Sequence, residues 1–302
     1  YYIVGDLGYS GTIPVTPGAF QASPAGMGDI FIAKFTSDHR MVWSTYYGGS
    51  DVDNAQGLVI DAGYIYLTGN TRSDDFPVTS GAFQSSNNGR IDGFIIKMDT
   101  SGQRIWATYI GGSLTERIRD VCVMNSGNIA VVGWTDSGDY PIVGSAYQPV
   151  FGGGGSDCFF SKFSANGGLF YSTYIGGISN EAYLSVAVTG NGNVVLAGSS
   201  VSSNYPVTPG AFQSTFSGDN GVITVFSGSD SLLWSTFFGG ASLTENIVSV
   251  AISGNNIFVV GEYAGWDYPV TSNAAQPLFG GYQDAFVASF DMTGSLRWST
   301  YL

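Results

Sequence analysis

The sequence predicts an all-β protein made of repeated four-stranded antiparallel sheets, and three observations support this prediction. Short runs rich in Val, Ile, Tyr, Phe, Trp and Thr are closed by Gly, Asn, Asp and Ser, which is the pattern of strands and tight turns. No segment shows the apolar period of a helix. Two independent markers recur at one interval of about 64 residues, so each sheet corresponds to one copy of a repeat.

The first marker is a proline that follows an aromatic residue or Ile, and the second is an aromatic residue before a Ser/Ala-Thr pair. The prolines are spaced by 63, 64, 65 and 63 residues: Pro14, Pro77, Pro141, Pro206 and Pro269. The aromatic residues are spaced by 63, 65, 63 and 64 residues: Trp43, Trp106, Tyr171, Trp234 and Trp298. We therefore expect one domain, residues 1–302, with repeats at about 1–47, 48–110, 111–175, 176–238 and 239–302.

The second copy shows the expected order of elements within a repeat. Strands are predicted at 56–61, 64–69, 93–99 and 104–110, with tight turns after the first and third and a loop of roughly twenty residues after the second. A sheet that is apolar on both faces must be covered on each side by its neighbours. Radial repetition achieves this, so we predict a β-propeller whose five long loops project from one face.

The two ends of the chain interrupt this order. If the segment after each glycine pair forms the innermost strand, as in other propellers, the first blade lacks its innermost strand and begins with the second, at 1–5. An open inner edge leaves backbone N–H and C=O groups unpaired. We therefore expect the natural polypeptide to extend beyond this N-terminus, so that the chain is a fragment of a longer protein.

Three linked segments of the second copy carry a family resemblance: GNTRSDDFPVTSGAFQ at 69–84, DGFIIKMD at 92–99 and WATYIGGS at 106–113. They resemble the bacterial SBBP repeat, a family named for a presumed seven-bladed β-propeller. The resemblance extends over the whole chain, although the chain shows five copies and not seven. It implies a propeller fold and a place in large secreted or surface-attached bacterial proteins, without one assigned chemistry.

Charge and hydropathy exclude some classes of partner. Ten Lys and Arg against 23 Asp and Glu give a net charge of −13, which disfavours binding to nucleic acid. All apolar runs are far shorter than the ~20 residues of a membrane-spanning helix, so we expect no membrane insertion. Only 11% of residues are charged, so Gly, Ser, Thr and Asn must cover much of the surface. This composition fits an extracellular or bacterial cell-surface location.

Acidic residues recur at two positions of the repeat. Asp29, Asp92, Asp157 and Asp284, with Asn220 in the fourth copy, begin the third strand, while Asp53, Glu116, Glu181 and Glu245 follow the glycine pairs. They could form a ring of carboxylates that binds Ca²⁺ or a cationic ligand. They could instead accept hydrogen bonds from turn N–H groups and tie one blade to the next. We favour the structural interpretation, because an active site usually breaks the symmetry of a repeat.

Few residues are suited to catalysis or to metal binding. The single histidine, His39, aligns with turn glycines of other copies, so we expect it to take a positive φ. Cys122 and Cys158 fall two strand spacings apart in one blade, which is too far for a disulfide. We therefore expect two thiols, no metal, no cofactor and no Ser-His-Asp triad.

Two aromatic residues that depart from the repeat are the best binding candidates. Trp134 takes the place held in the other copies by Asp6, Asn70, Ser199 and Glu262. Trp266 lies in a loop where the other copies have small or polar residues. Exposed aromatic rings stack on sugars or anchor protein partners.

Together these features favour a non-catalytic extracellular or cell-surface module that binds protein or glycan, or acts in adhesion, through its long loops. Two alternatives stay open. One is a secreted enzyme acting on polysaccharide with acidic residues at the central channel. The other is a purely architectural segment of a surface filament or adhesin. Catalysis would need acid and base residues that break the repeat on one face, and aligning the copies reveals no such cluster.

Overall fold

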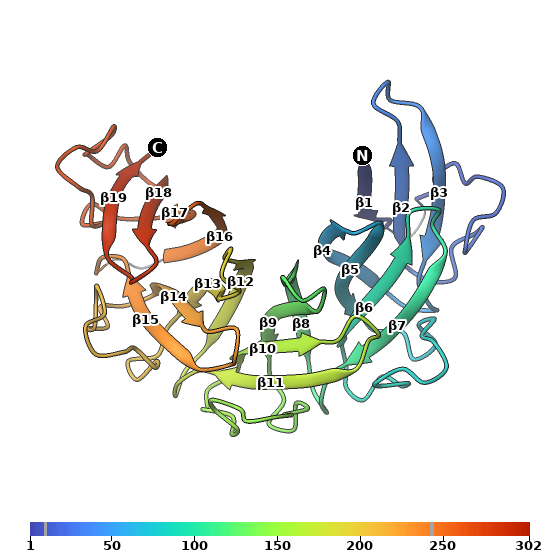
Figure 1. Cartoon of the computed structure of the whole chain (residues 1–302), viewed down its shortest axis with the longest axis horizontal. Coiled ribbons are helices and arrows are strands. Elements are labelled where there is room, and N and C mark those ends of the chain that lie inside the picture. The colour runs from blue at the N-terminus through green and yellow to red at the C-terminus, as the bar shows by residue number, and fades with distance from the viewer. Residues whose placement is uncertain (9–10, 242–244) are drawn as a thin grey trace. The chain divides into compact units, whose positions relative to one another are not determined.

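The computed structural model describes residues 1–8, 11–241 and 245–302, and for Glu245 only the backbone. Over these residues the all-β prediction is confirmed: the chain forms antiparallel sheets, turns and loops (Figure 1). The described part contains no helix that is long and apolar enough to span a membrane. The chain divides into two compact units, one of residues 1–121, 137–141 and 163–170, the other of 122–136, 142–162 and 171–302.

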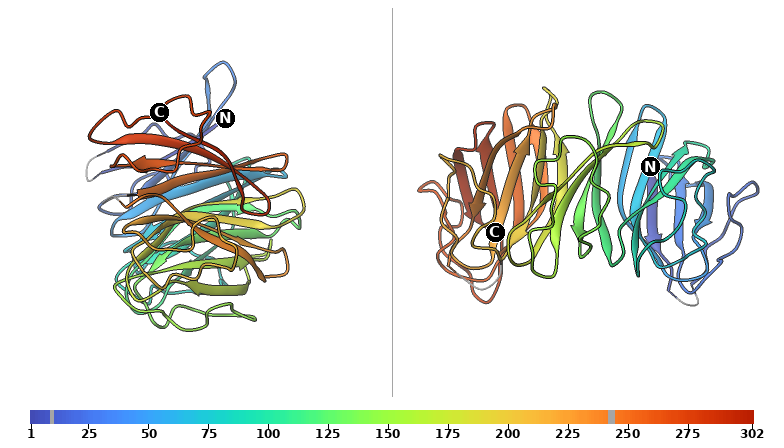
Figure 2. Two further views of the ribbon diagram at one scale, coloured as in Figure 1. Left: turned by 90° about the vertical axis from the view of Figure 1, so that its left-hand side faces the viewer. Right: turned by 90° about the horizontal axis from the view of Figure 1, so that it is seen from below.

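Within every sheet the strands neighbour one another in chain order, joined alternately by tight turns and long loops (Figure 2). The first sheet has three strands, β1 (Tyr2–Asp6), β2 (Ile30–Phe35) and β3 (Met41–Tyr47). The second contains β4 (Asp53–Asp61), β5 (Tyr64–Thr71), β6 (Asp92–Asp99) and β7 (Arg104–Ile110). The third contains β8 (Glu116–Val123), β9 (Ile129–Thr135), β10 (Asp157–Phe163) and β11 (Leu169–Ile175).

The remaining two sheets have four strands each. The fourth contains β12 (Glu181–Val188), β13 (Val194–Ser200), β14 (Asn220–Phe226) and β15 (Leu232–Phe238). The fifth contains β16 (Glu245–Ser253), β17 (Asn256–Tyr263), β18 (Asp284–Asp291) and β19 (Leu296–Tyr301). The sheets thus follow the predicted repeat, and the first has the predicted three strands.

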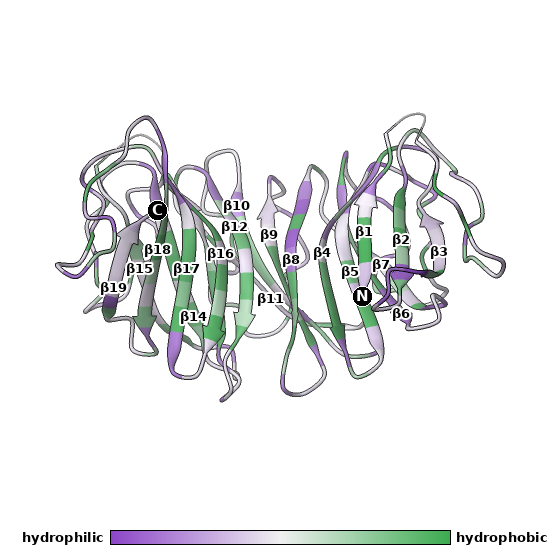
Figure 3. Cartoon of the chain, turned by 90° about the horizontal axis from the view of Figure 1, so that it is seen from above, coloured by the Kyte–Doolittle hydropathy of each residue, from purple (hydrophilic) through white to green (hydrophobic). Residues whose placement is uncertain are grey.

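The core of the first unit lies between its sheets. Ile65 and Leu67 of β5 and Phe94 of β6 are fully buried and belong to one cluster. Because side chains alternate across a strand, the residues between them cover the other face of the same sheet, where Tyr66 and Ile95 are also buried. Colouring by hydropathy shows the apolar strands and the more polar turns (Figure 3). A sheet buried on both faces is the reason that its strands read as nearly continuous apolar runs.

Tryptophans of the second marker join one sheet to the next. Trp43 Nε1 donates to the carbonyl of Thr100 at 2.9 Å, in the turn between β6 and β7. Trp106 Nε1 makes the same 2.9 Å bond to Ala165, in the turn after β10. The ring of Trp106 covers Gly167, where a Cβ atom would lie 2.9 Å from ring carbon Cδ2. The turn therefore needs a residue without a side chain over the ring, which explains why Trp and Gly recur together.

The second unit is built in the same way around its own core. Val259, Phe286 and Phe290 of the fifth sheet are buried in a single apolar cluster with residues of the fourth sheet. Trp234 Nε1 donates to the carbonyl of Met292 at 2.9 Å, which repeats the contact of the first unit. In the second unit Lys162 is almost fully buried and pairs with Asp230. Regular spacing of identical contacts is what makes the repeat length constant.

The long loops do not simply project, as the sequence led us to expect, because part of each packs on the outer strand. In the second sheet the loop after β5 runs along β7: Thr79 N donates to Ala107 O at 3.1 Å. Tyr109 N donates to Gln84 O at 3.2 Å. These bonds occupy backbone groups that an uncovered edge strand would leave open to association. The loops therefore protect the outer edges as well as exposing residues at the end of each sheet.

Candidate functional site

Most of the recurring acidic residues are buried at the end of the sheets where the first strand begins, and Asp284 of the fifth sheet is half-buried. In the second repeat Asp92 Oδ2 accepts hydrogen bonds from Asn88 N at 2.9 Å and Gln84 Nε2 at 2.6 Å. Glu116 Oε2 accepts one from Gly112 N at 2.9 Å. A Cβ atom on Gly111 would lie 2.4 Å from Glu116 Oε2 and 2.6 Å from Asp92 Oδ1, so the two carboxyl groups flank this glycine closely.

Two further pairs of carboxyl groups flank a glycine in the same way, and the fourth and fifth copies keep part of the arrangement. The pairs Asp29 with Asp53 and Asp157 with Glu181 flank Gly48 and Gly176, Asn220 is buried at the start of β14, and Asp284 accepts from Gly280 N. The side chain of Glu245 lies outside the described residues. Burial raises the pKa of Asp92 to about 6 and that of Asp53 and Asp157 to about 7. These contacts are those of turn caps. Among the described residues no group of three or more His, Cys, Asp and Glu is placed to bind a metal.

The two tryptophans singled out by sequence lie in different sheets. Trp134 lies on β9 and is half-buried, with contacts to neighbouring residues. Trp266 lies in the loop after β17 and is 86% exposed. His39 takes a φ of 65°, as predicted for the turn after β2, and its Nδ1 lies 2.8 Å from Tyr1 Oη. Cys122 and Cys158 are both thiols, also as predicted.

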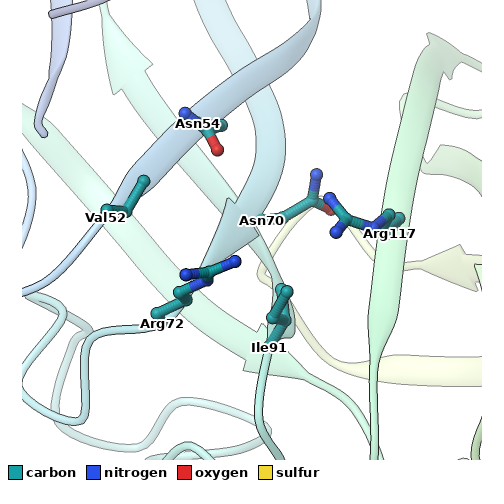
Figure 4. A pocket seen from close by; sticks show the side chains of 6 residues that line it. All are labelled: Val52, Asn54, Asn70, Arg72, Ile91 and Arg117. Atoms are coloured by element: carbon teal, nitrogen blue, oxygen red, sulfur yellow. The ribbon is translucent and has the colours of Figure 1, made fainter. Parts of the chain in front are cut away.

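A cationic pocket in the first unit is the site that the sequence analysis missed (Figure 4). Its cavity volume is about 250 Å³. The lining residues come from the open end of the β4–β5 hairpin, from the approach to β6 and from the start of β8: Val52, Asn54, Asn70, Arg72, Ile91 and Arg117. The pocket therefore opens at the end of the sheets where the buried carboxyl groups also lie.

Local pairing explains why these residues meet. Asn54 and Asn70 are register partners in the antiparallel β4–β5 pair. Arg72 follows β5 directly, and its backbone N donates to Val52 O at 3.0 Å. Glu116 N donates to Ile91 O at 2.8 Å, which holds the start of β8 beside the second sheet. Because Glu116 and Ile118 point into the core, the alternation of β8 leaves Arg117 between them on the other face.

The pocket is positively charged in a strongly acidic chain. Among the described residues, neither Arg72 nor Arg117 has a carboxylate within ion-pair distance. Arg119, two residues along β8, donates from Nη1 to Gln56 Oε1 at 2.8 Å. Burial, together with repulsion from the Arg117 guanidinium, lowers the pKa of Arg119. Three arginines thus lie close together, and β8 appears as a hydrophilic stretch (Figure 3).

The two asparagines of the pocket differ in their polar surroundings. The side chain of Asn54 lies near the carboxylate of Asp6 and lowers its pKa against the larger opposing effect of burial. Asn70 is only 3% exposed, and its Oδ1 has no hydrogen-bond partner. In the close-up the side chains of Asn70 and Arg117 extend toward one another (Figure 4). A buried polar atom without a partner is uncommon and costly, and this one belongs to a residue that lines the pocket.

Aligning the copies by basic residues would have found this site. Arg72 takes the place of Gly8, Asp136, Val201 and Ala264, and Arg117 takes the place of Asn54, Ala182 and Asn246. Arg72 and Arg117 are thus two of only ten Lys and Arg residues in the chain, and neither is found at the same position in another copy. A comparison of the copies for catalytic acids and bases does not single out these arginines, because Arg stays protonated near neutral pH and is not counted among such residues.

The lining residues determine what the pocket can do chemically. Two guanidinium groups present several N–H donors and are suited to a carboxylate, sulfate or phosphate group. Arg stays protonated and Asn does not titrate, so none of the six lining residues is a nucleophile or a general acid or base. Val52 and Ile91 add apolar walls. The arrangement is that of a binding site for an anionic group.

Comparison with known proteins bears on the fold. Residues 42–77 match the SBBP family, described as a β-propeller repeat. No curated protein sequence matches the chain. Hydrazine synthase from Kuenenia stuttgartiensis is 10% identical with a TM-score of 0.49, over 91% of this chain and 62% of the other, so this chain spans less than two thirds of that one.

Two further solved structures are similar to the chain. A protein of unknown function from Dyadobacter fermentans is 12% identical, with a TM-score of 0.48 over 97% of this chain and 74% of the other. Puromycin hydrolase is 12% identical, with a TM-score of 0.35 over 91% of this chain and 44% of the other. The resemblance stated from the sequence is thus confirmed at residues 42–77, which carry an SBBP β-propeller repeat within a chain of antiparallel propeller blades.

Proposed function

We propose that this chain is a non-catalytic extracellular or cell-surface binding module that holds an anionic group of a protein or glycan in the pocket of Arg72 and Arg117. One observation carries the proposal: two guanidinium groups without ion pairs face a single cavity. Placing like charges together costs free energy, so a fold retains such a cluster where an anion repays that cost.

The charge of the whole chain limits the kind of anion. With a net charge of −13, the chain repels a polyanion such as nucleic acid at long range. The guanidinium groups act over a few ångströms, because salt screens charge beyond ~8 Å. We therefore expect a ligand with isolated acidic groups, which is compatible with protein or glycan surfaces.

The alternatives are less well supported by the geometry. An enzyme acting on polysaccharide would need two carboxyl groups on either side of an open cleft. Asp92 and Glu116 are instead fully buried and bonded to turn N–H groups. An architectural role would not require uncompensated cationic side chains in a cavity.

Binding assays with charge-matched variants test the proposal. The purified chain is screened against neutral glycans, acidic glycans and acidic peptides, and the strongest binder is titrated by calorimetry at two salt concentrations. We expect Arg72→Ala with Arg117→Ala to weaken affinity by at least about tenfold, since each charge-assisted contact is worth ~1.5–3 kcal/mol. Arg90→Ala removes an exposed arginine outside the pocket and should leave affinity unchanged. Equal affinity of the double variant and the unmodified chain refutes the proposal.

A further inference from the structure

The orphan oxygen of Asn70 restricts what else the ligand must carry. Asn70 Oδ1 accepts hydrogen bonds only, and no donor of the described chain reaches it. An anionic group cannot satisfy it, because a carboxylate, sulfate or ionised phosphate oxygen is itself an acceptor. A ligand that fills the pocket well therefore presents a donor to Asn70 and an anionic group to the neighbouring guanidinium groups.

Resting on the function proposed above, we propose that the ligand is a sugar acid, a hydroxylated carboxylate such as a single uronic acid residue in an otherwise neutral glycan, and that Asn70 selects it. In the ring of a uronic acid, the carbon next to the carboxylate bears the ring oxygen, and the following carbon bears a hydroxyl donor. The side chain of Asp or Glu carries only methylene groups there, so an acidic protein side chain leaves Asn70 unpaired. The proposal thereby favours glycan over protein.

The other walls of the pocket suit a sugar ring. Val52 and Ile91 provide apolar surface for its C–H groups, and the amide of Asn54 adds a polar edge. The cavity of about 250 Å³ lies below the ~300–1,000 Å³ typical of sites for larger small molecules. It therefore holds one sugar residue, and the rest of a polysaccharide would run along the surface.

Asn70 is a specificity-determining residue under this proposal, and the fold tolerates its replacement. In the fourth repeat the same position is Ser199, so Asn70→Ser is compatible with the strand and keeps an acceptor. Asn70→Leu keeps the approximate shape and removes the acceptor. A thermal melt of both variants shows whether the fold is retained before any binding is measured.

The experiment compares a cyclic carboxylate that carries hydroxyl groups with one that carries none. Glucuronate and cyclohexanecarboxylate share a six-membered ring and an acid, but only glucuronate has hydroxyl groups. We expect the unmodified chain to bind glucuronate about tenfold more tightly than cyclohexanecarboxylate, because a ligand that leaves a buried acceptor unpaired loses affinity by about that factor. Asn70→Leu should reduce this ratio to about one, and Asn70→Ser should retain most of it. Lactate, an oligosaccharide with a single glucuronate residue and glucose 6-sulfate separate a free hydroxy acid, a glycan and a sulfated sugar as sources.

The outcomes separate this inference from the proposed function. If cyclohexanecarboxylate binds as tightly as glucuronate and binding depends on Arg72 and Arg117, the pocket binds anions but the choice of a sugar acid is wrong. The choice of a sugar acid is also wrong if an acidic peptide binds more tightly than any glucuronate probe, or if Asn70→Leu leaves the ratio unchanged. If no anionic probe binds, both proposals are wrong.

Discussion

The substitution Asp92→Asn tests whether a buried carboxyl group at the end of a sheet is protonated in the folded state. Asp92 is fully buried, and its Oδ2 accepts two hydrogen bonds, whereas Oδ1 has no partner. In the fourth repeat Asn220 stands at this position and donates from Nδ2 to Gly240 O at 3.3 Å. The site thus accommodates a donor, and a protonated Asp92 would provide one from Oδ1.

The magnitude follows from the pKa of Asp92, which burial raises from 3.8 to about 6. A folded pKa above the unfolded one means that the folded state binds more protons between these two values. The associated stability is therefore complete below pH 4 and is lost as pH rises through 6. The loss amounts to about 3 kcal/mol. Asn cannot ionise, so Asp92→Asn should be more stable than the unmodified chain above pH 7, by up to this amount.

Urea unfolding followed by tryptophan fluorescence at pH 4.5 and pH 8 measures the effect. We expect Asp92→Asn to raise the unfolding midpoint at pH 8 and to change it little at pH 4.5. Asp61→Asn, at an exposed site at the end of β4, serves as the control and should shift neither midpoint appreciably. A midpoint for Asp92→Asn that falls at pH 8 and rises at pH 4.5 would show that the carboxylate is charged when folded, which refutes the reasoning.

Two further substitutions test the contacts that hold the sheets together. Gly111→Ala should destabilise the fold by at least about 2 kcal/mol, because its Cβ would lie 2.4 Å from Glu116 Oε2, while Gly138→Ala, with nothing within 4 Å, should be nearly neutral in the same urea titration. Trp106→Phe removes the hydrogen bond to Ala165 O and should cost about 1–2 kcal/mol by the same measurement; an unchanged midpoint would mean that this bond does not stabilise the junction.

Local sequence patterns are sufficient to predict much of the fold. Gly, Asn and Asp identify the hairpin turns, and His39 takes the predicted positive φ. The predicted start of β4 lies three residues too late, because Asp53 and Asn54 resemble turn residues. Asp53 is nevertheless paired with Thr71 in the sheet, and its side chain bonds to the Thr71 hydroxyl and to Gly49 N. Hydrogen bonds from the folded structure thus stabilise Asp53 within a strand, although the propensity of Asp alone would favour a turn.

The pocket is harder to predict, because it depends on two successive repeats. Arg72 follows β5 of one sheet and Arg117 begins β8 of the next, so their proximity follows from sheet packing and not from chain order. The aromatic residue Trp134 stands out at the position that Asn70 occupies in the preceding copy. This repeat position is therefore recognisable as variable. The aromatic residue, however, directs attention to the third copy, whereas the residue that lines the pocket is Asn70 of the second. Whether a variable residue faces a cavity or a neighbour is decided by packing.

The backbone of the repeat stays constant at places where the pocket side chains change. Arg72 N donates to Val52 O at 3.0 Å, and in the fourth repeat Val201 N makes the equivalent bond to Asn180 O at 3.0 Å. Val201 therefore has an aliphatic side chain at the repeat position where Arg72 has a guanidinium group. Asn246 of the fifth repeat corresponds in the same way to Arg117. The carboxyl groups that cap the turns recur, while Arg72 occurs only in the second copy and Arg117 only in the third. The positions that recur in every copy thus stabilise the fold, and the positions that vary are available for recognition. Val201→Arg with Asn246→Arg therefore offers a way to build a second anion pocket on an unchanged backbone.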